Sequence, residues 1–158
     1  MGSTVVAPLI EALADKEGTV RKFAATLLGN LSDIHALDEL GMTLYDLHHE
    51  VSLAAAEALA KFGPQAMDIL SEGLLHPEAA VRKHAIIGLS RIQDEQVVPF
   101  LIEMLHDPDR TVKIQAIRSL GELHDQRAIP TLQEIVANRA DREISMLAKQ
   151  IVETIISK

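Results

Sequence analysis

The sequence repeats itself with a period of about thirty residues, and this period restricts the chain to a small set of folds. Five leucines follow one another at steps of 31, 30, 31 and 31 residues: Leu9, Leu40, Leu70, Leu101 and Leu132. A second apolar series runs parallel to the first, with steps of 31, 30, 31 and 32 residues: Val20, Val51, Val81, Val112 and Ile144. A fixed period of this length is typical of proteins in which one small structural unit is stacked on copies of itself.

Each period contains two stretches with helical spacing of apolar residues, separated by a turn. In the stretch 101–123, a short helix leads through an Asp-Pro-Asp turn into a second helix that begins near Thr111. The pattern predicts five helix pairs, at about 5–34, 35–64, 66–95, 97–126 and 128–157. In the second helix of the first pair we expect five buried residues: Val20, Ala24, Leu27, Leu28 and Leu31.

Helix ends are predicted from the residues that favour them. Thr19 is a candidate N-cap, because its hydroxyl can accept a free backbone N–H of the first turn. Gly63 can adopt the left-handed conformation that ends a helix, and a proline follows it. Pro99 and Pro130 are expected in the first turns of their helices, where a missing N–H costs nothing.

The composition excludes several classes of protein. The chain has 158 residues and no cysteine, so it has no disulfide, no cysteine-bound metal and no thiol nucleophile. It shows no signal-peptide pattern and no apolar run long enough to cross a membrane. A formal net charge of −8 opposes non-specific binding of nucleic acid. We therefore predict a soluble, cytoplasmic protein that does not contact a membrane, and we favour a protein partner over nucleic acid.

Three second helices share the motif Val-Arg/Lys-x-x-Ala-x-x-x-Leu-Gly, with Ser in place of the Gly in one of them, and close on Asp: VRKFAATLLGNLSD from Val20, VRKHAIIGLSRIQD from Val81 and VKIQAIRSLGELHD from Val112. This motif resembles the HEAT repeat family, in its short, regular form of the phycobilisome-lyase type. The resemblance implies an all-α fold, a right-handed α-solenoid of about five helix pairs stacked into one curved domain over residues 4–158. The same fold serves many functions, so the resemblance implies much less about the task of this chain.

In HEAT repeats, a turn Asp and the basic residue six positions later form a ladder along the stack. The resemblance places four such positions here. Two have both the acid and the base, at Asp15–Arg21 and Asp107–Lys113, and two depart from the pattern, at His76–Arg82 and Asp46–Ser52. The third pair lacks the acid and the fourth lacks the base. We interpret these residues as structural, because they would connect each turn to its helix.

The histidines are the candidates for metal chemistry. Four of them map to the turns within helix pairs: His48, His49, His76 and His106. Exposed turn residues explain them more simply than a zinc site, which needs ligand nitrogens about 2.0–2.1 Å from the metal. The HEAT-repeat di-iron hydroxylases carry several His-Glu pairs, whereas this chain has one, at His49-Glu50. The sequence shows no catalytic constellation, and we predict a protein that is not an enzyme and holds no cofactor or metal.

The resemblance also indicates a binding face. Positions two and six residues after each repeat's Val correspond to the concave lining of a HEAT solenoid. Together with flanking basic residues, the candidate partner-binding set is Lys22, Leu53, Lys83, Ile87, Arg91, Ile114, Arg118 and Met146. Exposed apolar groups with a polar rim often mark binding sites, although Leu53 and Met146 could instead complete the core between repeats.

The predicted function is therefore a non-enzymatic scaffold or adaptor that binds a protein or peptide on this concave face. The alternative is a subunit of an enzyme such as a bilin lyase, which rests on the family resemblance alone. Val5 and Val6 begin the first repeat without a polar cap. This apolar end predicts either self-association or a place within a longer chain.

Overall fold

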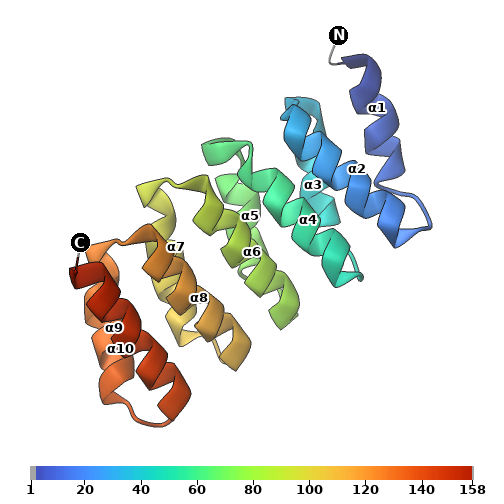
Figure 1. Cartoon of the computed structure of the whole chain (residues 1–158). Coiled ribbons are helices and arrows are strands. Elements are labelled where there is room, and N and C mark those ends of the chain that lie inside the picture. Colours follow the sequence, from blue (N-terminus) through green and yellow to red (C-terminus); the bar gives the residue numbers. More distant parts are fainter. Residues whose placement is uncertain (1–2, 158) are drawn as a thin grey trace. The chain divides into compact units, whose positions relative to one another are not determined.

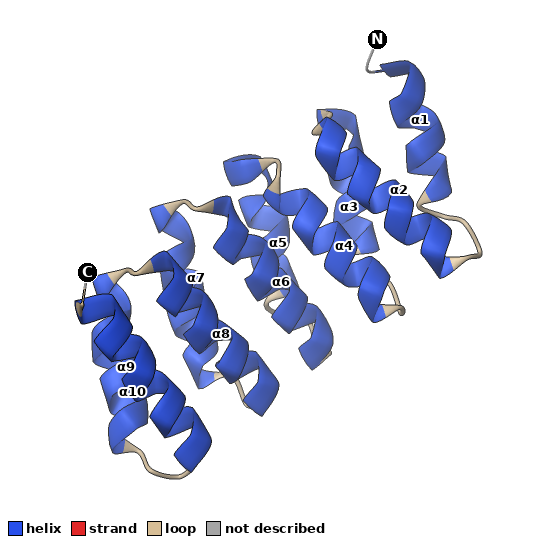
Figure 2. Ribbon diagram, viewed as in Figure 1, coloured by secondary structure: helices blue, strands red, loops and turns tan. Residues whose placement is uncertain are grey.

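A computed structural model describes residues 3–157 of the chain. In this range ten α-helices are joined by turns and short 3₁₀ segments, and no strand is present (Figure 2). The first helices of the five pairs are α1 (Ser3–Ala12), α3 (Leu37–Thr43), α5 (Met67–Gly73), α7 (Val98–Glu103) and α9 (Ile129–Ala137). The second helices are α2 (Gly18–Leu31), α4 (His49–Ala60), α6 (Ala79–Ile92), α8 (Arg110–Leu123) and α10 (Arg142–Ile156). The predicted all-α fold of helix pairs is confirmed.

Five 3₁₀ segments complete the connections: η1 (Ile34–Ala36), η2 (Gly63–Ala66), η3 (Glu95–Val97), η4 (Met104–His106) and η5 (Gln126–Ala128). Three of them begin at the Asp that closes the family motif. Asp33, Asp94 and Asp125 each accept a backbone N–H of the following turn. The motif Asp therefore marks the end of the second helix of one pair and the start of the turn that leads into the first helix of the next pair.

The chain divides into two compact units, and the boundary lies between Ile92 and Gln93. In unit 1, helices α2, α4 and α6 lie side by side, and α1, α3 and α5 each pack against the second helix of their pair (Figure 1). In unit 2, α8 and α10 lie side by side, and α7 and α9 pack against α8 and α10 respectively. A single domain over residues 4–158 stays a prediction.

The periodic apolar residues form the cores of both units. Four of the five periodic leucines are fully buried, namely Leu40, Leu70, Leu101 and Leu132. The Val series is buried as well from Val51 onward. Burial of each such side chain stabilises the fold by roughly 1.5–3 kcal/mol, so the period in the sequence is the period of the core.

The second helix of the first pair departs from the predicted core. Ala24 and Leu28 are buried, but Val20, Leu27 and Leu31 are exposed. These three residues lie on the side of α2 opposite Gly29, which is the residue that touches α4. The prediction that they are buried is wrong, because within the described residues no helix covers that side of α2. On α1, Val5 is likewise exposed and Val6 is buried.

The predicted helix ends are confirmed with one exception. Gly63 has a φ of 61°, and Pro99 and Pro130 lie in the first turns of α7 and α9. Thr19, however, is not an N-cap: α2 begins one residue earlier, after Glu17, which makes no side-chain cap bond. The left-handed position of Gly63 recurs at the end of other second helices, where non-glycine residues occupy it: Ser32, Gln93 and His124.

Neighbouring second helices approach each other closely through small residues. A Cβ atom added to Gly29 of α2 would lie 2.6 Å from the Cα and 2.7 Å from the Cβ of Ala58 on α4. Real Cβ atoms do not come that close, so the backbones of α2 and α4 can meet only because Gly29 has no side chain. Close packing of this kind tolerates no added methyl group without a shift of one helix.

We therefore expect Gly29→Ala to lower the free energy of unfolding by about 1–3 kcal/mol, although alanine favours a helix more than glycine does. The measurement is urea unfolding followed by circular dichroism. Thr26→Ala is the matched control, because Thr26 lies on the exposed side of the same helix and should change stability by less than about 0.5 kcal/mol. Equal stability of the two variants would show that the close contact does not limit the packing.

Candidate functional site

A groove in unit 2 contains three residues of the predicted binding face. It has a volume of about 710 Å³ and lies over α8 and α10. Its lining residues are Arg110, Ile114, Arg118, Glu143, Met146, Leu147, Lys149, Gln150 and Glu153. The predicted residues Ile114, Arg118 and Met146 thus come together, and the side chain of Met146 is 62% exposed.

Two of the three basic residues of this groove lie near carboxylates, and the third does not. Arg110 bonds to Asp141 at 2.7 Å and also to Glu143, and these bonds raise the pKa of the guanidinium and lower that of Asp141. Lys149 lies 4.0 Å from Glu153. Arg118, in contrast, pairs with no carboxylate among the described residues. It is therefore available to bind an anionic group of a ligand.

Sequence reasoning did not single out Leu147, Lys149 and Glu153 of this groove. They follow the periodic residue Ile144 by three, five and nine positions. The positions two and six residues after the periodic Val or Ile, from which the binding face was predicted, supply only four residues of the groove: Ile114, Arg118, Met146 and Gln150. A helical projection that included the next residues on the same face could have found the remainder.

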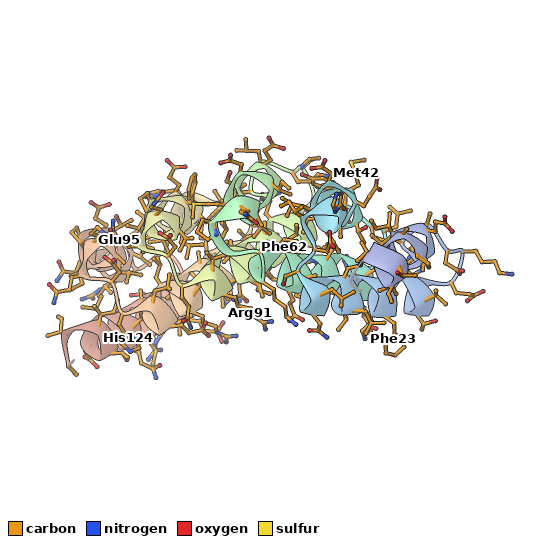
Figure 3. All side chains as sticks on the ribbon, turned by 90° about the horizontal axis from the view of Figure 1, so that it is seen from above. Phe23, Met42, Phe62, Arg91, Glu95 and His124 are labelled. Carbon is orange, nitrogen blue, oxygen red and sulfur yellow. The ribbon has the colours of Figure 1, made fainter. Side chains whose placement is uncertain are left out.

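Two of the three basic residues predicted in unit 1 are paired with glutamates. Lys22 of α2 pairs with Glu50 at 2.9 Å, and Arg91 of α6 pairs with Glu57 at 2.8 Å, both on α4. In Figure 3, Arg91 lies on the side of the second helices and Met42 lies on the opposite side of unit 1. The remaining predicted residues, Leu53, Lys83 and Ile87, are half-buried. The basic side chains at the two ends of this surface are therefore largely neutralised.

The four turn histidines do not form a metal site in the described part of the chain. His48, His49 and His106 are exposed, and His76 is half-buried and stacks on the ring of Tyr45 at a centroid distance of 5.2 Å. Within residues 3–157, no three His, Asp or Glu side chains are placed to share one ion. In the same range, no helix is both long and apolar enough to span a membrane.

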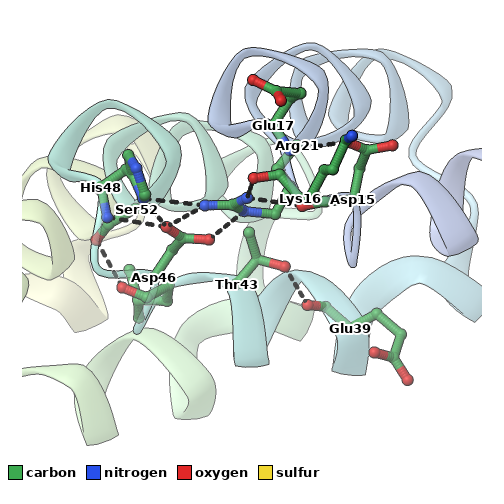
Figure 4. A network of polar contacts seen from close by, with 10 residues as sticks. Asp15, Lys16, Glu17, Arg21, Glu39, Thr43, Asp46, His48 and Ser52 are labelled. Atoms are coloured by element: carbon green, nitrogen blue, oxygen red, sulfur yellow. Dashed lines mark hydrogen bonds and ion pairs between the residues drawn. The ribbon is translucent and has the colours of Figure 1, made fainter.

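Arg21 connects the first two helix pairs of unit 1 (Figure 4). Its guanidinium donates to the backbone carbonyls of Asp15 and Lys16 and to the carboxylate of Asp46, with an Nε–Oδ2 distance of 2.6 Å. The Arg21 side chain holds the pKa of Asp46 below its usual range. The implied Asp15–Arg21 pair therefore acts through the backbone of Asp15, and the carboxylate comes from the next repeat.

A buried histidine, His84, bonds to Ser52, the residue that stands where the ladder of the second repeat would have a basic side chain. The Ser52 hydroxyl donates to the carbonyl of Leu44 at 2.6 Å and lies 2.9 Å from Nδ1 of His84. Because a serine hydroxyl carries one hydrogen, Nδ1 of His84 must be the donor in the second bond. Burial, assisted by the charge of Lys83, lowers the pKa of His84 to about 4. His84 is thus a neutral donor that joins α6 to α4.

Unit 1 should lose stability in mild acid because of His84. The unfolded chain binds a proton there near pH 6.5 and the folded chain near pH 4, so stability falls as the pH drops through this window. The contribution of this one group is at most about 3 kcal/mol. His84→Asn keeps a donor towards Ser52 but does not titrate, and should flatten the dependence of the unfolding free energy on pH between 6.5 and 4. The exposed His106→Asn should leave it unchanged, and equal slopes for both variants would contradict the assignment.

Comparison with known proteins agrees with this architecture. No curated protein matches the chain. Solved structures with the same fold include the complex of CpcE and CpcF of phycocyanin lyase from Nostoc sp. PCC7120, at 23% identity and a TM-score of 0.68, covering 95% of this chain and 64% of that one. Human deoxyhypusine hydroxylase aligns at 18% identity and a TM-score of 0.59, over 99% and 75% of the two chains.

A designed armadillo repeat protein in complex with the peptide (KR)4 aligns at 19% identity and a TM-score of 0.59, over 95% of this chain and 81% of that one. At these identities the likeness concerns the fold. The family comparison is more direct, because HEAT repeats match residues 6–82 and 67–151 and so cover most of the sequence. The chain belongs to the HEAT repeat family.

Proposed function

We propose that this chain is a non-enzymatic binding module that holds a segment of a protein or peptide in the groove over α8 and α10. The observation that carries the proposal is the convergence of Ile114, Arg118 and Met146 on this groove. The two apolar side chains, with Leu147, offer a surface that an apolar side chain of a ligand can cover. Exposed apolar groups surrounded by polar ones are typical of such sites.

The charges of the groove favour a ligand that carries a carboxylate. Arg110 is already held by Asp141 and Glu143, but Arg118 lies beside the apolar residues without a paired carboxylate among the described residues. A carboxylate of the ligand could form a bidentate bond with its guanidinium. We infer that the preferred segment places an acidic residue next to an apolar anchor.

The fold is suited to this role. A designed armadillo repeat protein with a similar fold is in complex with the peptide (KR)4, so a helical-repeat fold can bind a peptide. The alternative role is a subunit of a bilin lyase or another enzyme. It gives no residue of the groove a chemical function. On this proposal the groove residues of α8 and α10 act by binding, and no bond is made or broken there.

The test uses a random peptide library displayed on phage and selected on the immobilised chain. Selected peptides should be enriched in acidic residues next to an apolar one. Their affinity for Ile114→Glu/Met146→Glu should fall by a factor of ten or more, because a bound apolar side chain would lose about 1.4 kcal/mol or more. Arg118→Glu should lower the affinity of the acidic peptides by a similar factor. Fluorescence anisotropy of labelled peptides gives the dissociation constants.

Met42→Glu/Leu75→Glu is the control, because it places two carboxylates at exposed apolar positions in unit 1, away from the groove. This variant should bind the selected peptides as well as the unmodified chain does. Circular dichroism establishes that all variants are folded. If the selected peptides bind Ile114→Glu/Met146→Glu with unchanged affinity, the groove is not their binding site and the proposal is wrong.

A further inference from the structure

A smaller cleft adjoins the groove over α8 and α10. It has a volume of about 340 Å³, and its lining residues are Arg139, Arg142, Ser145 and Met146. Met146 lines the groove as well, so the two hollows meet at its exposed side chain. We call the smaller hollow the arginine cleft, because its charged lining residues are two arginines.

The two arginines of the cleft carry positive charge that the chain does not compensate. Arg139 and Arg142 are exposed, and neither forms an ion pair or a side-chain hydrogen bond with any residue that the structure describes. The carboxylates next to Arg142 in the sequence, Asp141 and Glu143, are both bonded to Arg110 instead. In a chain with a formal net charge of −8, a basic spot of this kind favours an anionic group of a partner.

The other polar groups at the start of α10 are already satisfied. The carboxylate of Asp141 accepts the backbone N–H of Glu143 at 3.0 Å and that of Ile144 at 3.1 Å. The hydroxyl of Ser145 donates to the carbonyl of Val136 at 3.1 Å. The side-chain donors that remain in the cleft are therefore the two guanidinium groups, each of which can form a pair of parallel hydrogen bonds with a carboxylate.

Arg118 and Arg142 lie on opposite sides of Met146 along the two helices. Gly121 of α8 meets Ile151 of α10, and the helices run side by side in the same direction (Figure 1). Three residues before this contact, Arg118 is level with position 148 of α10, about 9 Å beyond Arg142 at 1.5 Å per residue. Met146 lies between these two levels, so a side chain that covers it has a cation on each side.

We propose that the ligand of the groove carries an acidic residue on each side of its apolar anchor. Arg118 binds one of the two carboxylates, and Arg139 and Arg142 bind the other in the arginine cleft. This inference rests on the proposed function, because it requires a peptide segment whose apolar side chain covers Met146. It goes further by assigning a second acidic residue to the ligand and a second cationic site to the chain.

The distance between the cations suits an extended segment. Neighbouring helices are about 8–10 Å apart, and this sideways distance combines with the distance along the helices to about 13 Å between the backbones of Arg118 and Arg142. Four residues of an extended chain span about 13 Å. Because side chains two residues apart point to the same face of such a chain, the order acid-x-apolar-x-acid turns both acids and the anchor towards the groove.

The test is a double-mutant cycle between the chain and a peptide selected on it. Each acid beside the anchor is replaced by its amide, and fluorescence anisotropy gives the dissociation constants for the unmodified chain, Arg118→Gln and Arg139→Gln/Arg142→Gln. Either replacement should lower the affinity for the unmodified chain by about three- to tenfold. One of them should have no further effect on Arg118→Gln, and the other should have no further effect on Arg139→Gln/Arg142→Gln.

Lys16→Gln/Lys61→Gln is the matched control, because it removes two positive charges at exposed positions of unit 1. It should change the affinity by less than about twofold, since charges far from the ligand are screened by salt. A loss as large as that of Arg139→Gln/Arg142→Gln would show that only the overall charge matters, and would overturn the inference. Circular dichroism establishes that each variant is folded.

The outcomes separate this inference from the proposed function. If the selected peptides depend on Ile114 and Met146 but both acids keep their full effect with Arg139→Gln/Arg142→Gln, the groove binds peptides and the arginine cleft takes no part. Selected peptides with an acid on only one side of the anchor would overturn the inference in the same way. If no peptide depends on Ile114 and Met146, the proposed function is wrong and the second acidic site falls with it.

Discussion

The contact on which unit 1 depends is the close approach of neighbouring second helices through small residues. Gly29 meets the backbone of Ala58, and Gly88 meets the carbonyl oxygen of Ala56. These contacts bring apolar layers together with few aromatic side chains, which make up only 3% of the sequence. Because short helices are marginal when isolated, each of them owes its stability to this stacking. In unit 2 the contact has another form, in which Gly121 receives the larger side chain of Ile151.

Polar bonds then determine how the pairs align along the stack. Arg21 holds the turn of its own repeat through backbone carbonyls and the next repeat through Asp46. Where the basic residue is replaced by Ser52, the neutral ring of His84 supplies the bond between α4 and α6. In the described residues no buried side-chain nitrogen or oxygen lacks a hydrogen-bond partner. A buried network that is fully satisfied favours one alignment, because any shift would leave a polar group unpaired.

The period and the apolar spacing predict the helix pairs and most of the core, because both depend on each repeat's own residues. Features that depend on a neighbouring repeat are predicted less well. Leu27 has the same spacing as Ala58, yet only Ala58 has a helix against it, so a pattern cannot distinguish a covered side from an open one. The partner of Arg21 was likewise misplaced, since Asp46 comes from the following repeat. The residues of the groove were partly found because α8 and α10 repeat the same register.

The structure separates the residues that build the repeat from the exposed residues to which we assign binding. Small residues, periodic leucines and turn carboxylates are held by contacts within a unit, so a change there alters stability. The exposed positions of the second helices have no such constraint and differ between repeats. In unit 1 the cations Lys22 and Arg91 are neutralised by glutamates of α4, whereas Arg118 of unit 2 stays beside an apolar surface. On the proposed function, a carboxylate of the ligand would replace only water at Arg118, whereas at Lys22 or Arg91 it would have to displace a glutamate.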